Sequence, residues 1–478
     1  MKNNYKSLSR VERKTILLLC DDLRHHSGVG NIARDFVTHT AQHFNWIQIA
    51  GTGKVIDKTD TLDMSESLAE ISGVSDASLT VYPTLGYGNP SLLRKVLKKH
   101  KPDAVFIFTD PRYWEWLFDM EREIRQQCPI VYLNIWDNYP APMYNRPFYL
   151  SCDLLLSISK QTKNINEIVL GEDKKYHLIE YVPHGADPKV FYPIEDIDSC
   201  LFLKEQIFNN KIPSFTVLFN SRNIRRKNAL NIMLGFKLFC DKIGKSNSKE
   251  VALIMHTDPL EKEGPNLIEA KKAFCDPEFN QVYFSTRGIS SKQMNILYNI
   301  TDVNILVSNA EGWGMSITEA TLAGTMSIVS ATGGIQDQCR FVDEKGNWIN
   351  FSQDFPSNHT GKYKECGEWV LPIFPKSRTL VGSQKTPYIY QDNVDAEQIA
   401  EELLRCYNMS SEERKRRGLR GREWFMSEEA GFTSIQMSNR IIDACDKLLE
   451  RNDRRKDYEL YKVSDYSDNK RITHSLTY

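Results

Sequence analysis

The first part of the chain alternates short apolar runs with amphipathic segments. Segments with helical spacing lie between the runs, at 31–44, 90–100 and 111–127. Repeated strand and helix alternation is typical of a parallel sheet covered by helices on both faces. The predicted strands are 14–20, 45–51, 103–108, 129–135, 153–159 and 177–182.

The alternation stops at residues 186–200, which are rich in proline and acid, and it restarts at 215–221. Further strands are predicted at 251–257, 281–286, 303–308 and 325–330, again with helical patterns between them. We therefore expect an α/β protein in which two Rossmann-like, doubly wound parallel-sheet domains face each other across a cleft.

The pattern also predicts the domain boundaries. The N-terminal Rossmann-like domain should span 1–195, and the C-terminal Rossmann-like domain should span 196–430. Turn residues and weak periodicity predict a loop-rich insertion at about 340–392. A helix at 431–450 should pack back on the N-terminal domain, followed by a polar tail at 451–478.

Charge and cysteine content narrow the class of protein. With 61 basic and 62 acidic residues, the net charge of -1 gives no overall field toward nucleic acid or an anionic membrane. The ten cysteines include no C-x-x-C pair, which favours a reducing compartment. No run approaches the roughly 18 apolar residues of a membrane span, so we expect a cytoplasmic protein. The basic segment 92–102 favours a solvated helix end over a membrane or nucleic-acid patch.

The sequence SNAEGWGMSITEATLAG, residues 308–324, is the strongest candidate site. Glu311 directly follows a predicted strand, and residues 315–322 have helical spacing. The Gly312-Trp313-Gly314 turn therefore presents backbone N–H groups at a helix N-terminus, which favours an anion. Carboxylates accept hydrogen bonds from vicinal hydroxyls, so Glu311 and Glu319 beside an anion site indicate a sugar phosphate.

Three motifs together resemble the retaining GT-B glycosyltransferases of family 4, the glycosyl transferases group 1. They are AEGWGMSITEA at 310–320, SRNIRRKN at 221–228 and YVPHGADPKVFYP at 181–193, in matching order and spacing. The resemblance covers residues 14 to 445, without the insertion and the tail.

This resemblance implies roles for individual residues. Glu311 would hold hydroxyls of the donor sugar, and Glu319 would hold the ribose of the nucleotide. Arg222 and Lys227 would bind the diphosphate, because a leaving diphosphate needs fixed positive charge; for Arg226, donor binding and a surface position remain equally open. The catalytic set is then Glu311, Lys227, Arg222 and Asp137, and the remaining donor-binding set is Glu319, Gly312, Trp313, Gly314, Met315, Ser316 and Arg226.

The first half offers a second group of candidates. Gly28, Val29 and Gly30 resemble the family's glycine-rich loop, which approaches the diphosphate or the acceptor. Asp137 stands where many relatives carry a histidine, so it could orient the acceptor, orient the sugar or cap a turn. His184 and Asp187 are expected to fix the crossover between domains rather than to contact substrate. Candidate acceptor contacts are Asp110, Arg112, Tyr113, Trp136 and Tyr139.

The remaining motifs are weaker. The segment GTGK at 51–54 lacks the spacing of a phosphate-binding P-loop, and His25 and His26 lack a metal-binding partner spacing. Asp196 and Asp198 form an Asp-x-Asp pair, but no apolar strand precedes them to aim both carboxylates into a cleft. We therefore expect no metal and no cofactor, since the nucleotide sugar is itself a substrate.

The resemblance therefore implies a retaining hexosyl- or pentosyltransferase that moves a sugar from a nucleotide-diphosphate sugar to an acceptor hydroxyl. Its partners would be that donor and a glycan or lipid-linked acceptor, and contact with the inner face of a membrane is left open. A hydroxylated DNA base is a less favoured acceptor, because the neutral charge balance disfavours nucleic acid. The same motifs are also compatible with a sugar-nucleotide epimerase, a phosphorylase or a non-catalytic nucleotide-sugar binding protein.

Overall fold

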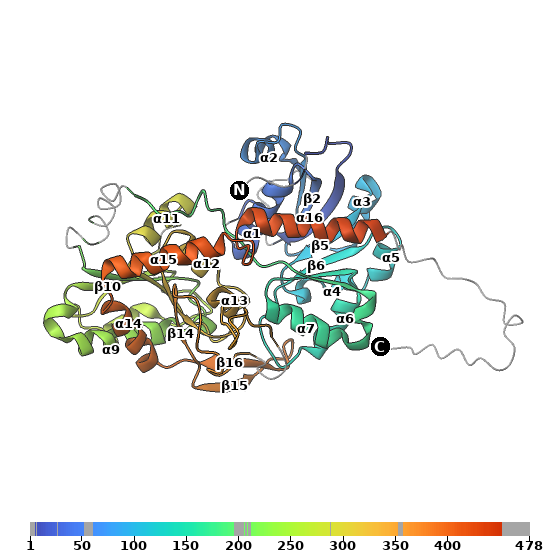
Figure 1. The fold of residues 1–478 in the computed structure, drawn as a ribbon. Helices are drawn as coiled ribbons and strands as arrows, with labels where there is room; N and C mark the ends of the chain where they lie inside the picture. Colours follow the sequence, from blue (N-terminus) through green and yellow to red (C-terminus); the bar gives the residue numbers. More distant parts are fainter. Residues whose placement is uncertain are drawn as a thin grey trace, which may run out of the picture.

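The two sets of apolar runs form two separate sheets in the computed structural model (Figure 1). One sheet has eight strands in the order β3-β4-β2-β1-β5-β6-β7-β8, and the other has six in the order β11-β10-β9-β12-β13-β14. The structure describes residues 5, 7–25, 27–51, 61–195, 205, 208, 212–286, 288–351 and 357–451.

In the N-terminal sheet every strand pair is parallel except β3 with β4. Helices cover both faces, as expected for strands whose residues are buried on both sides. The strands are β1 (Lys14–Asp21), β2 (Phe44–Gly51), β3 (Leu62–Asp63), β4 (Leu79–Pro83), β5 (Ala104–Phe108), β6 (Ile130–Asn134), β7 (Leu154–Ser157) and β8 (Leu178–Tyr181).

Two of the three helices predicted in this domain are present, since 31–44 overlaps α1 and 90–100 coincides with α3. The pattern at 111–127 predicts one helix, but the structure divides it into η1, α4 and α5. The helices are α1 (Gly28–Thr40), α2 (Ser65–Ser72), α3 (Pro90–His100), η1 (Pro111–Trp114), α4 (Glu115–Phe118), α5 (Glu121–Arg125), η2 (Met143–Asn145), α6 (Arg146–Leu150), α7 (Lys160–Leu170) and η3 (Gly171–Tyr176).

The C-terminal sheet is parallel throughout. Its strands are β9 (Phe215–Asn220), β10 (Val251–His256), β11 (Gln281–Ser285), β12 (Val303–Leu306), β13 (Ser327–Ser330) and β14 (Val370–Ile373). Its helices are η4 (Arg225–Lys227), α9 (Ala229–Ser248), α10 (Leu267–Phe274), α11 (Ser291–Asn299), α12 (Met315–Leu322), α13 (Ile335–Cys339), α14 (Ala396–Tyr407) and α15 (Ser411–Phe425).

The region predicted as an insertion at 340–392 is more regular than expected. Strand β14 pairs in parallel with β13, so residues 370–373 belong to the C-terminal sheet. Strands β15 (Ser377–Val381) and β16 (Ile389–Asn393) then form an antiparallel hairpin. The prediction of an insertion across the whole region is therefore wrong, because β14 is only four residues long and lacks a clear periodicity.

Helix α16 (Ser434–Arg451) returns to the N-terminal domain and lies across it in Figure 1. Ser434 Oγ donates to Asp35 at 3.0 Å, and Lys447 forms an ion pair with Glu180 at 2.6 Å. The two chain segments that connect the domains also touch, through a parallel bridge between Ala186 and Thr433.

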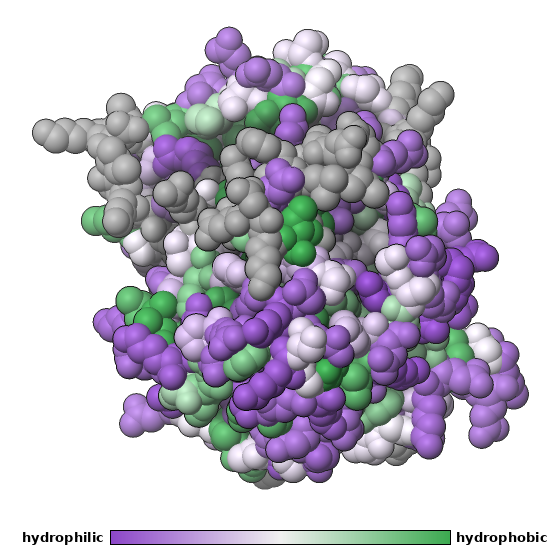
Figure 2. All heavy atoms as spheres, turned by 90° about the vertical axis from the view of Figure 1, so that its left-hand side faces the viewer, coloured by the Kyte–Doolittle hydropathy of each residue, from purple (hydrophilic) through white to green (hydrophobic). Residues whose placement is uncertain are grey.

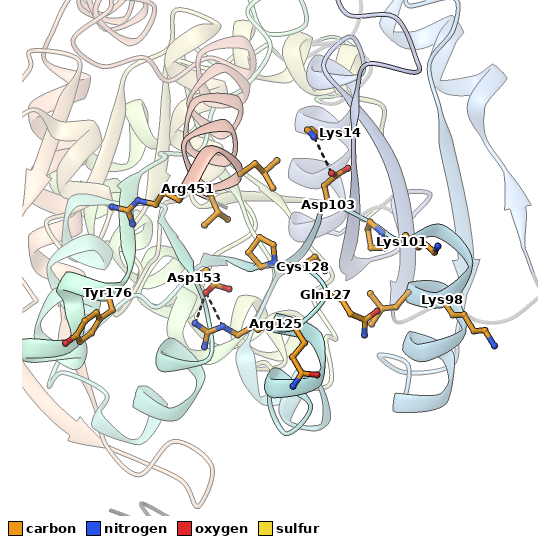
Figure 3. A pocket seen from close by; sticks show the side chains of 16 residues that line it. Lys14, Lys98, Lys101, Asp103, Arg125, Gln127, Cys128, Asp153, Tyr176 and Arg451 are labelled. Atoms are coloured by element: carbon orange, nitrogen blue, oxygen red, sulfur yellow. Dashed lines mark hydrogen bonds and ion pairs between the residues drawn. The ribbon is translucent and has the colours of Figure 1, made fainter. Parts of the chain in front are cut away.

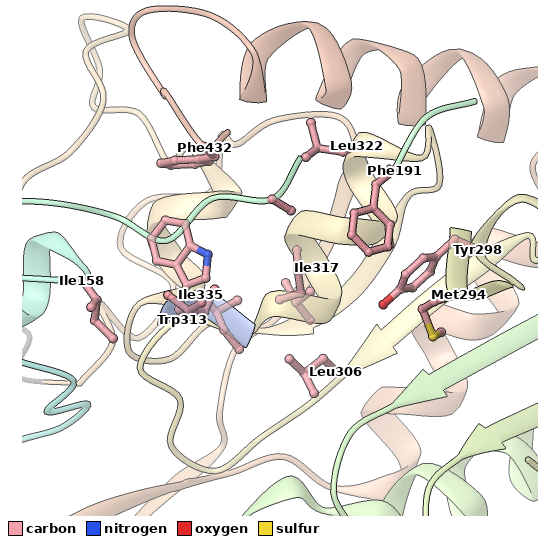
Figure 4. Close-up of a cluster of buried hydrophobic side chains, with 14 of the residues drawn as sticks. Ile158, Phe191, Met294, Tyr298, Leu306, Trp313, Ile317, Leu322, Ile335 and Phe432 are labelled. Carbon is pink, nitrogen blue, oxygen red and sulfur yellow. The ribbon is translucent and has the colours of Figure 1, made fainter. Parts of the chain in front are cut away.

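A cluster of buried side chains holds α12 against these two connecting segments (Figure 4). The Trp313 ring packs edge to face against Phe432, with centroids 4.8 Å apart. Phe191, from the first connecting segment, packs against Tyr298 at 6.1 Å. Burial of such large rings contributes strongly to stability, so the helix that begins beside Glu311 is fixed by the packing between domains.

The outer surface is mostly polar on the end formed by the C-terminal domain (Figure 2), where hydrophobic side chains occur in small separate groups. Within the described ranges, no helix combines the length and the apolar character needed to cross a bilayer.

Candidate active site

A cavity of about 550 Å³ lies where the carboxyl ends of the two sheets meet. In open parallel sheets this edge is where ligands bind, because loops and helix N-termini converge there. Loops after β1, β6, β9 and β12 all contribute to its lining. Lining residues named in the sequence analysis are Gly28, Val29, Asp137, His184, Asp187, Arg222, Arg226, Lys227, Glu311, Gly312, Trp313, Gly314, Met315, Ser316 and Glu319.

Glu311 is the centre of a buried ion cluster, with only 7% of its surface exposed. Its Oε2 atom accepts a hydrogen bond from Lys227 Nζ, another from Arg226 at 3.3 Å and a third from Ser308 Oγ at 3.1 Å. Arg226 also donates to the Ala310 carbonyl at 2.7 Å. The Oε1 atom takes part in none of these bonds.

The cluster determines the charge of Glu311. Burial by itself would raise the pKa of this carboxyl, but Lys227 and Arg226 outweigh burial and lower the pKa to about 2. Glu311 is therefore ionised throughout the physiological range, as a fixed hydrogen-bond acceptor.

The turn after Glu311 is shaped by close backbone contacts. Gly314 has a left-handed φ of 90°, which favours glycine, and it precedes the first residue of α12. A second loop, after β13, supports the turn from behind: a Cβ on Gly334 would lie 1.8 Å from the Gly312 carbonyl oxygen. The sequence analysis missed this loop, although its Gly333-Gly334 pair directly after a predicted strand was a usable signal.

Glu319 lies one helical turn deeper in α12 and is in a different environment. Its Oε2 accepts a hydrogen bond from Tyr298 Oη at 2.8 Å. Burial raises the pKa of Glu319 to about 7, and the Tyr298 bond only partly opposes this. This carboxyl therefore changes its charge near neutral pH. Tyr298, which also accepts from Asn220 at 2.8 Å, was not named in the sequence analysis because its partners come from separate motifs.

The positions of Arg222, Arg226 and Lys227 in the structure differ from the pairing that the sequence implied. Arg226, for which two positions were left open, is part of the Glu311 cluster together with Lys227. Arg222 lines the cavity, but its side chain is 62% exposed and pairs with Glu261 at 3.1 Å. The reason is local: Arg226 and Lys227 belong to η4, which turns them toward β12, whereas Arg222 precedes that turn.

The glycine-rich segment starts α1 at the opposite wall. Ser27 caps the helix by accepting from the Gly30 N–H at 2.9 Å, and it donates to Asp21 at 2.7 Å. A Cβ on Gly30 would lie 3.0 Å from the Asp22 and His25 carbonyl oxygens. Gly28 and Val29 line the cavity, while Gly30 supports them from beneath.

Asp137 lies on the N-terminal side of the cavity, next to the Gly312 turn. A Cβ on Gly312 would lie 3.6 Å from the Asp137 Cβ. Burial raises the pKa of Asp137, and the nearby Arg226 partly opposes the increase. Its backbone carbonyl accepts from Gln161 at 2.8 Å.

The five candidate acceptor residues do not line this cavity, and their contact with an acceptor stays a prediction. Arg112 pairs with Asp110 and lies over the Trp136 ring at 5.1 Å. Tyr113 stacks on Tyr87 at 4.4 Å. The ring nitrogen of buried Trp136 donates to Asn138, and the Tyr139 hydroxyl accepts from Asn164. Trp136 and Tyr139 are therefore buried in the packing of this domain, whereas the Tyr113 ring is about half exposed.

His184 and Asp187 also differ from expectation, because both line the cavity although they belong to the connecting segment. Burial lowers the pKa of His184 to about 3, so its ring is neutral. Asp196 and Asp198, residues 52–54 and His26 lie outside the described residues. Among the described residues, no group of three His, Cys, Asp or Glu side chains could hold a metal ion.

A larger cavity, of about 670 Å³, lies at the opposite edge of the N-terminal sheet (Figure 3). Its charged residues are largely paired with one another, as in Arg125 with Asp153 at 2.6 Å and Lys14 with Asp103 at 3.5 Å. It contains none of the predicted site residues, and it lies at the amino ends of the strands, away from the edge that binds ligands.

Comparison with known proteins shows which protein family part of this chain matches. Residues 206–353 match the family model described as glycosyl transferases group 1. This match contains η4, Glu311 and α12. No curated protein matched by sequence.

Solved structures share the fold over nearly the whole chain. A sucrose-phosphate synthase from Thermosynechococcus elongatus has a TM-score of 0.63 at 16% identity, covering 92% of this chain and 100% of that one. A glycosyltransferase from Rickettsia africae has a TM-score of 0.61 at 15% identity, with the same coverage. An Escherichia coli structure described as trehalose-6-phosphate bound with UDP-2-fluoro glucose has a TM-score of 0.61 at 12% identity, covering 91% and 99%.

Residues 206–353 are therefore a glycosyl transferases group 1 domain, which supports a glycosyltransferase enzyme. The predicted fold class is confirmed over nearly the whole chain, and the predicted family matches over residues 206–353.

We predict that Lys227→Met destabilises the protein by about 3 kcal/mol, because it leaves a buried carboxylate short of its main partner. The double variant Lys227→Met with Glu311→Gln should recover much of this loss. In the unchanged protein the contribution of Glu311 is present above its usual pKa of 4.5 and is lost as pH falls toward 2. Thermal unfolding of the single variants Lys227→Met and Glu311→Gln, the double variant and the parent measures the coupling, and additive effects would contradict a cluster.

Proposed function

We propose that the chain transfers a sugar from a nucleotide-diphosphate sugar to an acceptor hydroxyl with retention at the anomeric carbon, without a metal ion. The observation that carries this proposal is the shared lining of one cavity by the Glu311 cluster, the α12 N-terminus and Glu319. The carboxylates of Glu311 and Glu319 can accept hydrogen bonds from hydroxyl groups of the donor. The N-terminus of α12 lies between them along the chain and favours an anion.

The donor would lie along these groups. Lys227, Arg226 and the backbone N–H groups at the start of α12 stabilise the diphosphate, since a helix N-terminus and fixed cations favour an anion. The Oε1 atom of Glu311 accepts hydroxyls of the donor sugar, because Oε2 is already used by the cluster. Glu319 accepts the ribose hydroxyls. The ion pair between Arg222 and Glu261 is exposed and therefore weak. Arg222 leaves Glu261 and binds the diphosphate when the donor is present.

In the proposed reaction the acceptor oxygen forms a bond to the anomeric carbon while the bond from that carbon to the diphosphate oxygen breaks. The acceptor proton passes to the departing diphosphate, and the products are a glycoside and a nucleoside diphosphate. Asp137 orients the reacting hydroxyl from the N-terminal side. The acceptor is a glycan or a lipid-linked sugar.

We predict that affinity for the nucleotide sugar rises about fivefold to tenfold as pH rises through 7. A hydrogen bond to an ionised carboxylate is stronger by about 1 kcal/mol than one to a neutral group, and the pKa of Glu319 lies at about 7. Calorimetry between pH 6 and 8 should show this rise, with the donor chosen by thermal shift from UDP-, GDP- and ADP-hexoses. A diphosphate diester does not titrate in this range, so the ligand itself adds no slope.

The variant Glu319→Gln provides the control, because its amide cannot ionise. Its affinity should be lower than that of the parent at pH 8 and flat with pH. A flat profile in the parent, or an unchanged slope in the variant, would remove Glu319 from the ribose site.

We predict that excess EDTA leaves turnover nearly intact, and that Asp196→Ala with Asp198→Ala does the same. Lys227→Ala should instead lower turnover by about 10² to 10³, the usual cost of removing one preorganised charge donor. Turnover is measured as release of nucleoside diphosphate. Loss of activity in EDTA that manganese or magnesium restores would overturn the metal-free mechanism.

A further inference from the structure

The hairpin β15–β16 belongs to the C-terminal domain but is anchored to the N-terminal domain (Figure 1). Asn138 Nδ2 donates to the Tyr390 carbonyl at 2.6 Å, and the Tyr390 N–H donates to the Tyr139 carbonyl at 2.7 Å. Tyr144 Oη donates to the Tyr388 carbonyl at 2.9 Å, and Arg112 donates to the Lys385 carbonyl at 3.3 Å. These four contacts hold the hairpin against the N-terminal domain.

A further cavity, of about 260 Å³, lies beneath this hairpin, and we call it the hairpin cavity. It shares two lining residues, Asp137 and Arg226, with the cavity of about 550 Å³ that contains the proposed donor site, which we call the donor cavity. The two spaces are therefore neighbours that meet at the proposed reaction centre. The hairpin contributes most of the remaining lining: Val381, Gly382, Ser383, Thr386, Ile389, Tyr390 and Gln391.

The chemistry of this hairpin cavity is polar but almost uncharged. The side chains of Thr386 and Gln391 form no hydrogen bond within the described part of the chain, so they are available to a ligand. Arg226 is the one cation among the described lining residues, and it is already bonded to Glu311 and to the Ala310 carbonyl. Nearby Arg112 is paired with Asp110.

We propose that the hairpin cavity binds the acceptor as an unphosphorylated sugar, whose hydroxyl reaches Asp137 at the wall shared with the donor cavity. Hydroxyl and amide side chains beside an aromatic ring suit a neutral sugar ring. A phosphate would need a free cation that the described lining does not offer. The cavity is smaller than the pockets of about 300 to 1,000 Å³ that take drug-sized ligands, so it fits a single terminal sugar.

This inference rests on the proposed function, since it assigns the acceptor side of the same reaction. It also gives a role to two of the candidate acceptor residues. Arg112 and Tyr139 bond the hairpin, Trp136 packs against Arg112, and the hairpin supplies the direct contacts to the sugar.

The test uses the full chain saturated with the nucleoside diphosphate that corresponds to its donor. The probes are methyl glycosides of glucose, galactose and mannose, with glucose 6-phosphate as the charged counterpart, and binding is measured by saturation-transfer NMR. At least one methyl glycoside should bind, more tightly than glucose 6-phosphate. The double variant Thr386→Val with Gln391→Leu should weaken that binding about tenfold, since each lost hydrogen bond costs several-fold in affinity.

Gln384→Leu is the matched control, because Gln384 lies on the exposed tip of the same hairpin and does not line the cavity. It should leave glycoside binding unchanged. Hydrolysis of the nucleotide sugar without acceptor should be unchanged in this control variant, and thermal unfolding confirms that both variants are folded.

Unchanged glycoside affinity in the double variant, absence of binding by every methyl glycoside, or tighter binding of glucose 6-phosphate would each overturn the inference. Failure of the unchanged protein to bind or hydrolyse any nucleotide sugar is a different result, and it would overturn the proposed function itself.

Discussion

The site depends on the buried ion cluster in which Lys227 and Arg226 hold Glu311. Its partners come from loops that follow β9 and β12, and these strands are direct neighbours in the C-terminal sheet. Parallel pairing therefore places the cations beside the carboxylate. Buried charges are costly unless they are paired, so the cluster also fixes the conformation of both loops. The same cluster presents the second carboxylate oxygen of Glu311 and the start of α12 to the cavity.

Glu311 and Glu319 are only eight positions apart, but their different environments give their carboxyl groups different pKa values. Glu311 is ionised because two cations surround it, whereas Glu319 is close to half ionised at neutral pH because burial dominates. The packing of Trp313 against Phe432 and of Tyr298 against Phe191 keeps this helix fixed relative to both connecting segments. In the proposed reaction, this rigidity sets the donor geometry, and the hairpin on the opposite side closes the acceptor space.

Local patterns in the sequence predicted most of the fold. Apolar runs identified strands such as β1 and β12, and helical spacing located α12 at residues 315–322. Strand β4 was missed because LTVYP mixes polar and apolar residues, and β14 was missed because it is short. For the site, Glu311 and Lys227 were found because each follows a strand within a motif. The hairpin contacts could not be predicted, since Tyr390 meets Tyr139 only through the arrangement of the two domains.

The anomeric configuration of the first product tests the central claim most directly. Proton NMR of a reaction started with an α-linked nucleotide sugar, sampled before the product can equilibrate, reports that configuration from the coupling of the anomeric proton. The proposed arrangement, with acceptor and diphosphate on the same side of the sugar at Asp137 and Lys227, predicts an α-linked product. A β-linked product would contradict it.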